Sequence, residues 1–97
     1  MQDTAARVSF DTAAFGRWVR EQRKRLGFKS TEQFSKEILR MSGRSISRNT
    51  LYKLETGQQE IDMDRMAAIV WAIFPGQPCT KLRDVFLLFV NVEEGGR

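Results

Sequence analysis

The chain contains no histidine and a single cysteine among its 97 residues. These absences exclude a Cys/His zinc site, a catalytic triad built on histidine and a disulfide within the chain. No apolar run approaches the roughly eighteen residues that a membrane-spanning helix needs. The opening MQDTAARVSF lacks the long apolar region and the small-residue cleavage site of a secretory signal. We therefore expect a protein of the reducing cytoplasm, with no metal, no cofactor and no membrane partner.

Proline is also scarce, with only Pro75 and Pro78, and no stretch of useful length alternates as a strand would. The remaining signals are helical almost throughout, and a chain of this length makes one domain. The expected fold is all-α, a compact bundle of about five short helices. Residues 1–9 are expected to be a flexible N-terminal segment, residues 10–92 the folded domain with its C-terminal helix, and residues 93–97 a tail.

Local start and stop signals mark the expected helices. A serine or aspartate at the N-cap accepts hydrogen bonds from free backbone N–H groups, and a glycine past the last turn ends a helix. Most of these caps also have an apolar residue before them that can pack against the first turn. Helices are expected to begin after Asp11, Ser30, Ser47 and Asp62 and at Thr80, and to end near Gly27, Gly43, Gly57 and Pro75-Gly76, with Trp18, Phe34, Trp71 and Phe74 in the core.

The charges are segregated along the chain. Residues 1–53 hold twelve lysines and arginines against five acidic residues, a balance of +7, whereas residues 54–97 hold four against seven, a balance of −3. A basic half beside an acidic half indicates a polyanionic partner on one side of the molecule. Single basic residues are often only solvated, and Arg17, Arg20, Lys24 and Arg25 are interpreted in that way.

The segment SISRNTLYKLETG, residues 45–57, places polar and apolar residues on opposite sides of a short helix. Leu51 and Leu54 share one face, while Arg48, Asn49 and Lys53 lie on the other. The preceding helix, from STEQFSKEI, is joined to it by a short turn that contains Gly43. Two helices in this arrangement form a helix–turn–helix.

At these residues the sequence resembles the lambda-repressor-like family (Cro/C1-type, also called XRE-type). The matching segments are FGRWVREQRKRLG, STEQFSKEI, SISRNTLYKLETG and DMDRMAAIVWAI, which together span residues 15–74. The resemblance implies a lambda-repressor-like fold whose second and third helices form the DNA-binding motif. It also implies a phage or bacterial repressor that inserts the third helix into the major groove of double-stranded DNA.

One departure concerns the turn between these two helices. Phe34-Ser35 occupies the place of the family's Leu-Ala pair, and LRMSGR lengthens the path to Ser47. Either the second helix is longer by one turn or the connection is a true loop. Arg44, in this added segment, could reach a phosphate or could simply be solvated.

The resemblance also assigns contact residues. Arginine can donate to two acceptors of guanine and asparagine can pair with the adenine edge, which makes Arg48 and Asn49 the strongest candidates. A capping role competes with DNA contact for Ser30, and packing against the second helix competes for Tyr52. The base-reading set is Ser47, Arg48, Asn49 and Lys53, and the DNA-backbone set is Lys29, Ser30, Thr31, Gln33, Arg44, Tyr52, Thr56, Gln58 and Gln59.

Arg23 and Glu55 are expected to form a structural pair. In the family that the sequence resembles, an arginine late in the first helix pairs with the glutamate that ends the third. Such a pair would tie the recognition helix to the core and aim Arg23 toward the DNA backbone. Glu55 is therefore interpreted as structural. No nucleophile–base pair, paired carboxylates or Gly-rich phosphate loop appears, and we do not expect an enzyme.

The last helix carries VFLLFV, which has more apolar residues than one buried stripe requires. Either the N-terminal segment with Val8 and Phe10 folds over it, or a second subunit does. The second alternative is favoured, which predicts a homodimer through Val85, Phe86, Leu88 and Phe89. A competing interpretation of the whole chain is a helical protein-interaction module, of antitoxin or repressor-partner type, that uses this apolar helix.

Overall fold

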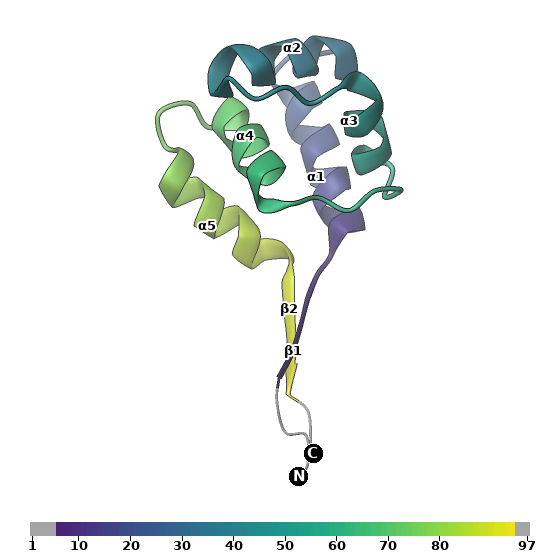
Figure 1. Cartoon of the computed structure of the whole chain (residues 1–97), viewed down its shortest axis with the longest axis vertical. Helices are drawn as coiled ribbons and strands as arrows, with labels where there is room; N and C mark the ends of the chain where they lie inside the picture. Colours follow the sequence, from purple (N-terminus) through teal and green to yellow (C-terminus); the bar gives the residue numbers. More distant parts are fainter. Residues whose placement is uncertain (1–5, 95–97) are drawn as a thin grey trace.

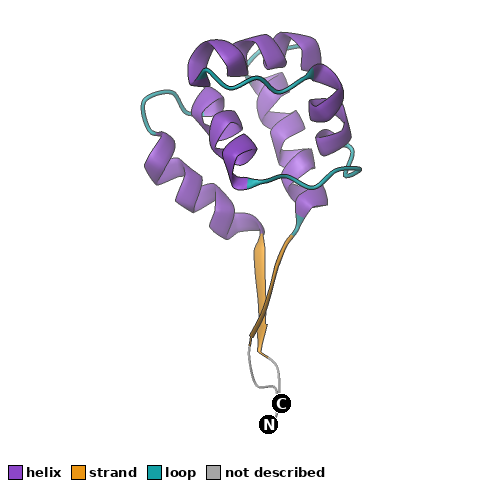
Figure 2. Cartoon of the chain, viewed as in Figure 1, coloured by secondary structure: helices purple, strands orange, loops and turns teal. Residues whose placement is uncertain are grey.

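The computed structural model describes residues 6–94, which form a mostly helical domain with a small two-stranded sheet. Within these residues the chain has five helices and two strands. Figures 1 and 2 show the helices gathered into one body, from which the strands project. In chain order the elements are β1 (Ala6–Phe10), α1 (Thr12–Arg25), α2 (Thr31–Ser42), α3 (Arg48–Glu55), α4 (Met63–Ile73), α5 (Pro78–Phe89) and β2 (Val90–Glu94).

Four of the helices begin where their capping residues predicted. The side chains of Asp11, Ser30, Ser47 and Asp62 each accept a hydrogen bond from the backbone N–H three residues later, at 2.8–3.1 Å. Each bond satisfies a donor that the first turn of a helix would otherwise leave free. The fifth helix starts at Pro78 rather than Thr80, because proline lacks an N–H and its fixed φ suits the first helical position.

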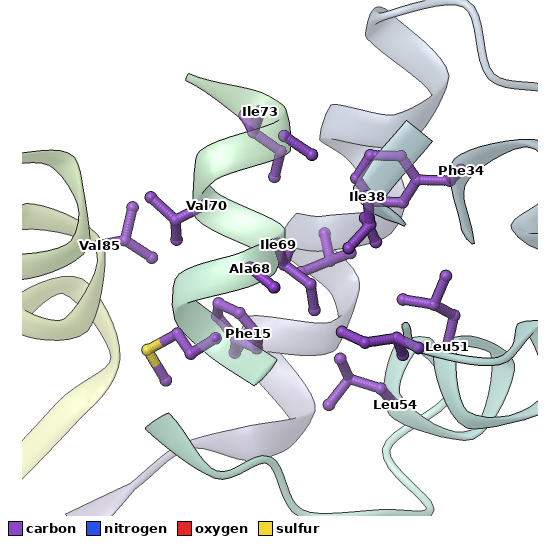
Figure 3. Close-up of a cluster of buried hydrophobic side chains, with 14 residues drawn as sticks. Phe15, Phe34, Ile38, Leu51, Leu54, Ala68, Ile69, Val70, Ile73 and Val85 are labelled. Carbon is purple, nitrogen blue, oxygen red and sulfur yellow. The ribbon is translucent and has the colours of Figure 1, made fainter. Parts of the chain in front are cut away.

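The core lies where α1, α2, α3 and α4 meet (Figure 3). Phe15 from α1, Phe34 and Ile38 from α2, and Ile69 from α4 are fully buried there. Helix α5 adds Val85 from one side of α4. Trp18 and Phe74 are partly buried against this cluster, as expected, whereas Trp71 is 42% exposed. The assignment of Trp71 to the core was therefore wrong, since its position on α4 faces outward.

The sheet was not predicted. β1 pairs with β2 in antiparallel register, with Phe10 opposite Val90 and Val8 opposite Val92. The expectation of an all-α chain, with residues 1–9 flexible and residues 93–97 a tail, is corrected for the residues that lie in these strands. Neither strand could be recognised alone, because five residues give a weak pattern and their partners lie at opposite ends of the chain.

The N-terminal strand also covers part of α5. The Phe10 ring stacks on Phe86 with 5.5 Å between ring centroids, and it lies edge-on to Phe89 at 6.2 Å. The Asp11 N–H donates to the Phe89 carbonyl at 2.8 Å. One of the two covers proposed for the apolar last helix is thus supplied by the chain itself.

Among residues 6–94, none of the helices combines the length and apolar character needed to cross a membrane.

Candidate nucleic-acid interface

Helix α3 is held against the body by its apolar side. Leu51 and Leu54 are buried in the core shared with α1 and α2. Gly16 of α1 allows the two helices to meet backbone to backbone, since a Cβ atom at this position would lie 2.0 Å from the Leu54 carbonyl oxygen. Because a side chain cannot fit there, this glycine fixes how closely α3 approaches α1.

The expected Arg23–Glu55 pair is present and is buried. Arg23 donates through Nε and Nη2 to the two carboxylate oxygens of Glu55, at 2.9 and 3.1 Å. Its Nη1 donates to the Phe28 carbonyl at 2.9 Å. The pair therefore ties the C-terminal end of α3 to the end of α1. Because Arg23 is buried and each of its three side-chain nitrogens donates inside the protein, the expectation that it is aimed at a DNA backbone gains no support.

The connection between α2 and α3 is a loop that is anchored at both of its ends. Gly43 ends α2 in the left-handed region at φ 74°. Near α3, the Ser35 hydroxyl donates to the Ile46 carbonyl, and the Ile46 side chain is buried. Ser35 thus fastens the loop to α2. The sequence left open whether the second helix is longer or the connection is a true loop. Both apply in part, because α2 extends to Ser42 and a loop follows.

Arg44, in that loop, is paired with an acidic residue of α4. Its Nη2 atom lies 2.9 Å from the Asp64 carboxylate, and both side chains are more than half exposed. The structure therefore directs Arg44 to the first turn of α4 and does not bring it to the start of α3. Its predicted contact with a DNA backbone gains no support from this placement.

The outer side of α3 is polar and open to solvent. Arg48, Asn49, Tyr52 and Lys53 are all exposed, so Tyr52 is not buried against α2. Ser47 is exposed too, but its hydroxyl accepts from the Thr50 N–H and lies 3.0 Å from the Thr50 hydroxyl. The side chains of Arg48, Asn49, Tyr52 and Lys53 therefore project into solvent from one side of a short helix.

The N-terminal end of α2 lies beside the start of α3. Glu32, in the first turn of α2, places a carboxylate oxygen 3.7 Å from Nη1 of Arg48. The Ser30 hydroxyl oxygen accepts from the Gln33 N–H, as in a capping box. The Gln33 side-chain oxygen accepts from the Lys29 N–H at 2.7 Å, one residue before the usual donor. The side chains of Ser30 and Gln33 are thus engaged in the cap, whereas Lys29 is exposed and Thr31 is half-buried.

The end of α3 is closed by its own side chains. The Thr56 hydroxyl donates to the Tyr52 carbonyl at 2.9 Å, and the Gln58 amide donates to the Thr56 oxygen at 2.7 Å. Gln59 is half-buried beside Ile61. Of the three residues expected to lie along DNA after this helix, Thr56 and Gln58 are exposed and Gln59 is less accessible.

Large apolar side chains are also exposed on α5 and on the sheet. Leu87 and Leu88 are 61% and 68% exposed, and Val8 and Val92, which face each other across the strands, are 66% and 61% exposed. Val85, assigned to a subunit interface from the sequence, is buried in the core, and that assignment is corrected. Phe86 and Phe89 are partly covered by Phe10, which leaves Leu88 as the open member of the predicted set.

Two residues of this region were missed by the sequence analysis. Gly16 gave no signal because it lies inside a helix, where a close approach by another backbone cannot be read from the sequence. Glu32 lies within the capping box that was recognised, but its neighbour Arg48 belongs to a different helix. In the described part of the chain, no group of Cys, Asp and Glu side chains is arranged to hold a metal ion.

The sequence matches no protein-family model, and neither curated proteins nor solved structures contain a match to it.

Proposed function

We propose that this protein is a sequence-specific regulator that binds double-stranded DNA by inserting α3 into the major groove. The observation that carries the proposal is the two-sided character of α3, with Leu51 and Leu54 buried and Arg48, Asn49 and Lys53 exposed. A helix held rigidly by its inner side can present its outer polar groups to base edges without paying much to order them.

The chemistry of the exposed side agrees with this role. Arginine and asparagine are the side chains that make two-point contacts with guanine and adenine. Lys29 lies at the start of α2, next to a helix end whose positive dipole favours a phosphate. In this proposal α2 and α3 form the helix–turn–helix of a lambda-repressor-like fold, and the protein is a phage or bacterial repressor that acts in the cytoplasm.

The test is selection of bound duplexes from a random pool, followed by a salt titration on the enriched duplex. A common motif should emerge, and the logarithm of the affinity should fall with the logarithm of salt by about 0.9 per phosphate neutralised. Lys53→Glu should weaken binding about tenfold or more. Arg83→Glu, which reverses a positive charge on the exposed side of α5, is the matched control and should bind nearly as wild type. Absence of an enriched motif, or equal losses in the two variants, would contradict the proposal.

The proposed regulator acts as a homodimer through the exposed apolar surface of α5. Leu88 is the most exposed of the large apolar side chains there, and its burial between two copies would remove apolar area from water. A dimer would place two copies of α3 on half-sites roughly 34 Å apart in a near-palindromic operator. Sedimentation equilibrium should show a dimer that Leu88→Ser weakens. If the wild-type chain stays monomeric at high concentration and the enriched DNA site is asymmetric, the homodimer is refuted. The protein would then bind DNA as a monomer.

The same surface favours the second candidate function, a helical interaction module that binds another protein. Four large apolar side chains are exposed, Leu87 and Leu88 on α5 and Val8 and Val92 on the sheet, and exposed apolar groups of this kind mark protein contacts. Salt separates the two functions, because apolar association is little weakened by salt whereas phosphate contacts are strongly weakened. Under the second function, Leu88→Ser would abolish partner binding and Lys53→Glu would leave it intact.

A further inference from the structure

An acidic residue, Glu32, lies where α2 and α3 meet, on the side that would face DNA in the proposed function. Glu32 lies in the first turn of α2 and Arg48 in the first turn of α3, with 3.7 Å between their charged groups. Their side chains are 56% and 65% exposed. The nearby polar groups of Gln33 and Ser47 are engaged in helix caps. The carboxylate is therefore a free acceptor beside the arginine that is expected to read DNA.

Stability does not explain this pair well. An exposed ion pair contributes little to folding, because solvent screens it and two long side chains must be ordered. A carboxylate in the first turn of α2 suits the helix dipole, but it would do so without lying next to Arg48. Near DNA, its charge opposes that of the phosphates. Its placement beside Arg48 is better explained by a direct role in reading bases.

We propose that Glu32 and Arg48 form one base-reading unit that selects a guanine and a cytosine in adjacent base pairs. This inference rests on the function proposed above. Arg48 would donate to O6 and N7 of guanine, and the Glu32 carboxylate would accept from N4 of cytosine. An ionised carboxylate only accepts hydrogen bonds, so it is repelled by the acceptors that guanine and thymine present.

The ion pair leaves Arg48 able to do this. Arginine has five N–H donors in a planar fork, and the Glu32 oxygen that lies 3.7 Å from Nη1 is beyond hydrogen-bond distance. The other edge of the guanidinium remains available for two-point contact with a base. Glu32 thus acts as a positioning residue for Arg48 and as a reader of the neighbouring donor.

The test compares selections from a random duplex pool for the wild type, Glu32→Gln and Glu37→Gln. Glutamine keeps the size of Glu32 but adds a donor, and it pairs with adenine. Glu32→Gln should therefore lower the preference for cytosine at one position about tenfold and shift it toward adenine, while the guanine read by Arg48 is retained less strictly. Glu37→Gln is the matched control, since it removes the same charge from the same helix.

Glu37 suits this purpose because it is bound elsewhere, to both Nε and Nη2 of Arg40. These hydrogen bonds, with the accompanying charge attraction, raise the pKa of Arg40. Glu37→Gln should leave base preference unchanged. If Glu32→Gln strengthens binding to all sequences alike, as loss of a repelling charge would, the reading unit is refuted while DNA binding stands. If the wild type enriches no motif, the proposed function and this inference both fail. Thermal melting by circular dichroism verifies that both variants fold.

Discussion

The two ends of α3 carry the same kind of ion pair in opposite environments. At its C-terminal end Glu55 is buried and receives two hydrogen bonds from Arg23. At its N-terminal end Arg48 is exposed, and its Nη1 atom lies 3.7 Å from a Glu32 carboxylate oxygen, beyond hydrogen-bond distance. A buried pair is costly to break from one side, whereas an exposed pair costs little to break. One short helix thus separates a structural pair from a pair that is free to rearrange on binding.

The largest effect is expected at the buried end. Glu55→Ala removes the partner of two Arg23 nitrogens and leaves a buried charge uncompensated, so it should lower the free energy of unfolding by about 3–5 kcal/mol. Chemical denaturation measures this directly. The double variant Arg23→Met/Glu55→Leu replaces both charges with apolar groups and should be more stable than Glu55→Ala. A loss as small as that from Glu32→Ala would mean that the two pairs do not differ as described.

Gly16→Ala should produce the next largest effect, and its sign is informative. In an unconstrained helix this change would stabilise by up to about 1 kcal/mol. Here the new Cβ would lie 2.0 Å from the Leu54 carbonyl oxygen, which is a backbone atom. We expect the reverse sign, a loss of about 1–3 kcal/mol, because α3 must move away from α1. Thermal unfolding followed by circular dichroism distinguishes the signs, and a stabilised variant would show that the close approach is not required.

The features that the sequence predicted well are local ones. Asp11, Ser30, Ser47 and Asp62 were identified as caps because a cap depends on residues within one turn. The burial of Leu51 and Leu54 followed from helical spacing alone. The Arg23–Glu55 pair is a distant contact, and it was expected only because the sequence resembles a family in which such a pair occurs.

The features that were missed depend on how distant segments meet. The pairing of Val8 with Val92 joins opposite ends of the chain. Phe10, at the end of the same strand as Val8, then stacks on Phe86 of α5. Arg44 was free to be assigned to DNA because the position of Asp64 could not be known from the sequence. The contact between Glu32 and Arg48 depends on the angle between α2 and α3, which the longer connection left undetermined.

A smaller effect is expected from Ser47→Ala, at the exposed end of α3. The hydroxyl of Ser47 accepts from the Thr50 N–H, so its removal should cost about 1 kcal/mol in the free energy of unfolding. Base preference on selected duplexes should remain as in the wild type, since the hydroxyl is engaged in the cap. Ser47→Asp, which restores an acceptor at the cap, should recover the stability. Altered base preference in Ser47→Ala would show that Ser47 contacts bases, as the sequence predicted.

The smallest effect on stability is expected two residues further along. Asn49 is exposed on the outer side of α3, and its replacement by alanine should change the free energy of unfolding by no more than about 0.5 kcal/mol. If Asn49 pairs with an adenine, the same change should reduce discrimination at one base position by about 1–3 kcal/mol. Denaturation and duplex selection on Ser47→Ala and Asn49→Ala should therefore give opposite results within a single helical turn. Equal losses of stability would show that both side chains stabilise the folded protein. A residue that only contacts DNA makes no stabilising contact in the free protein, so its replacement should not lower stability.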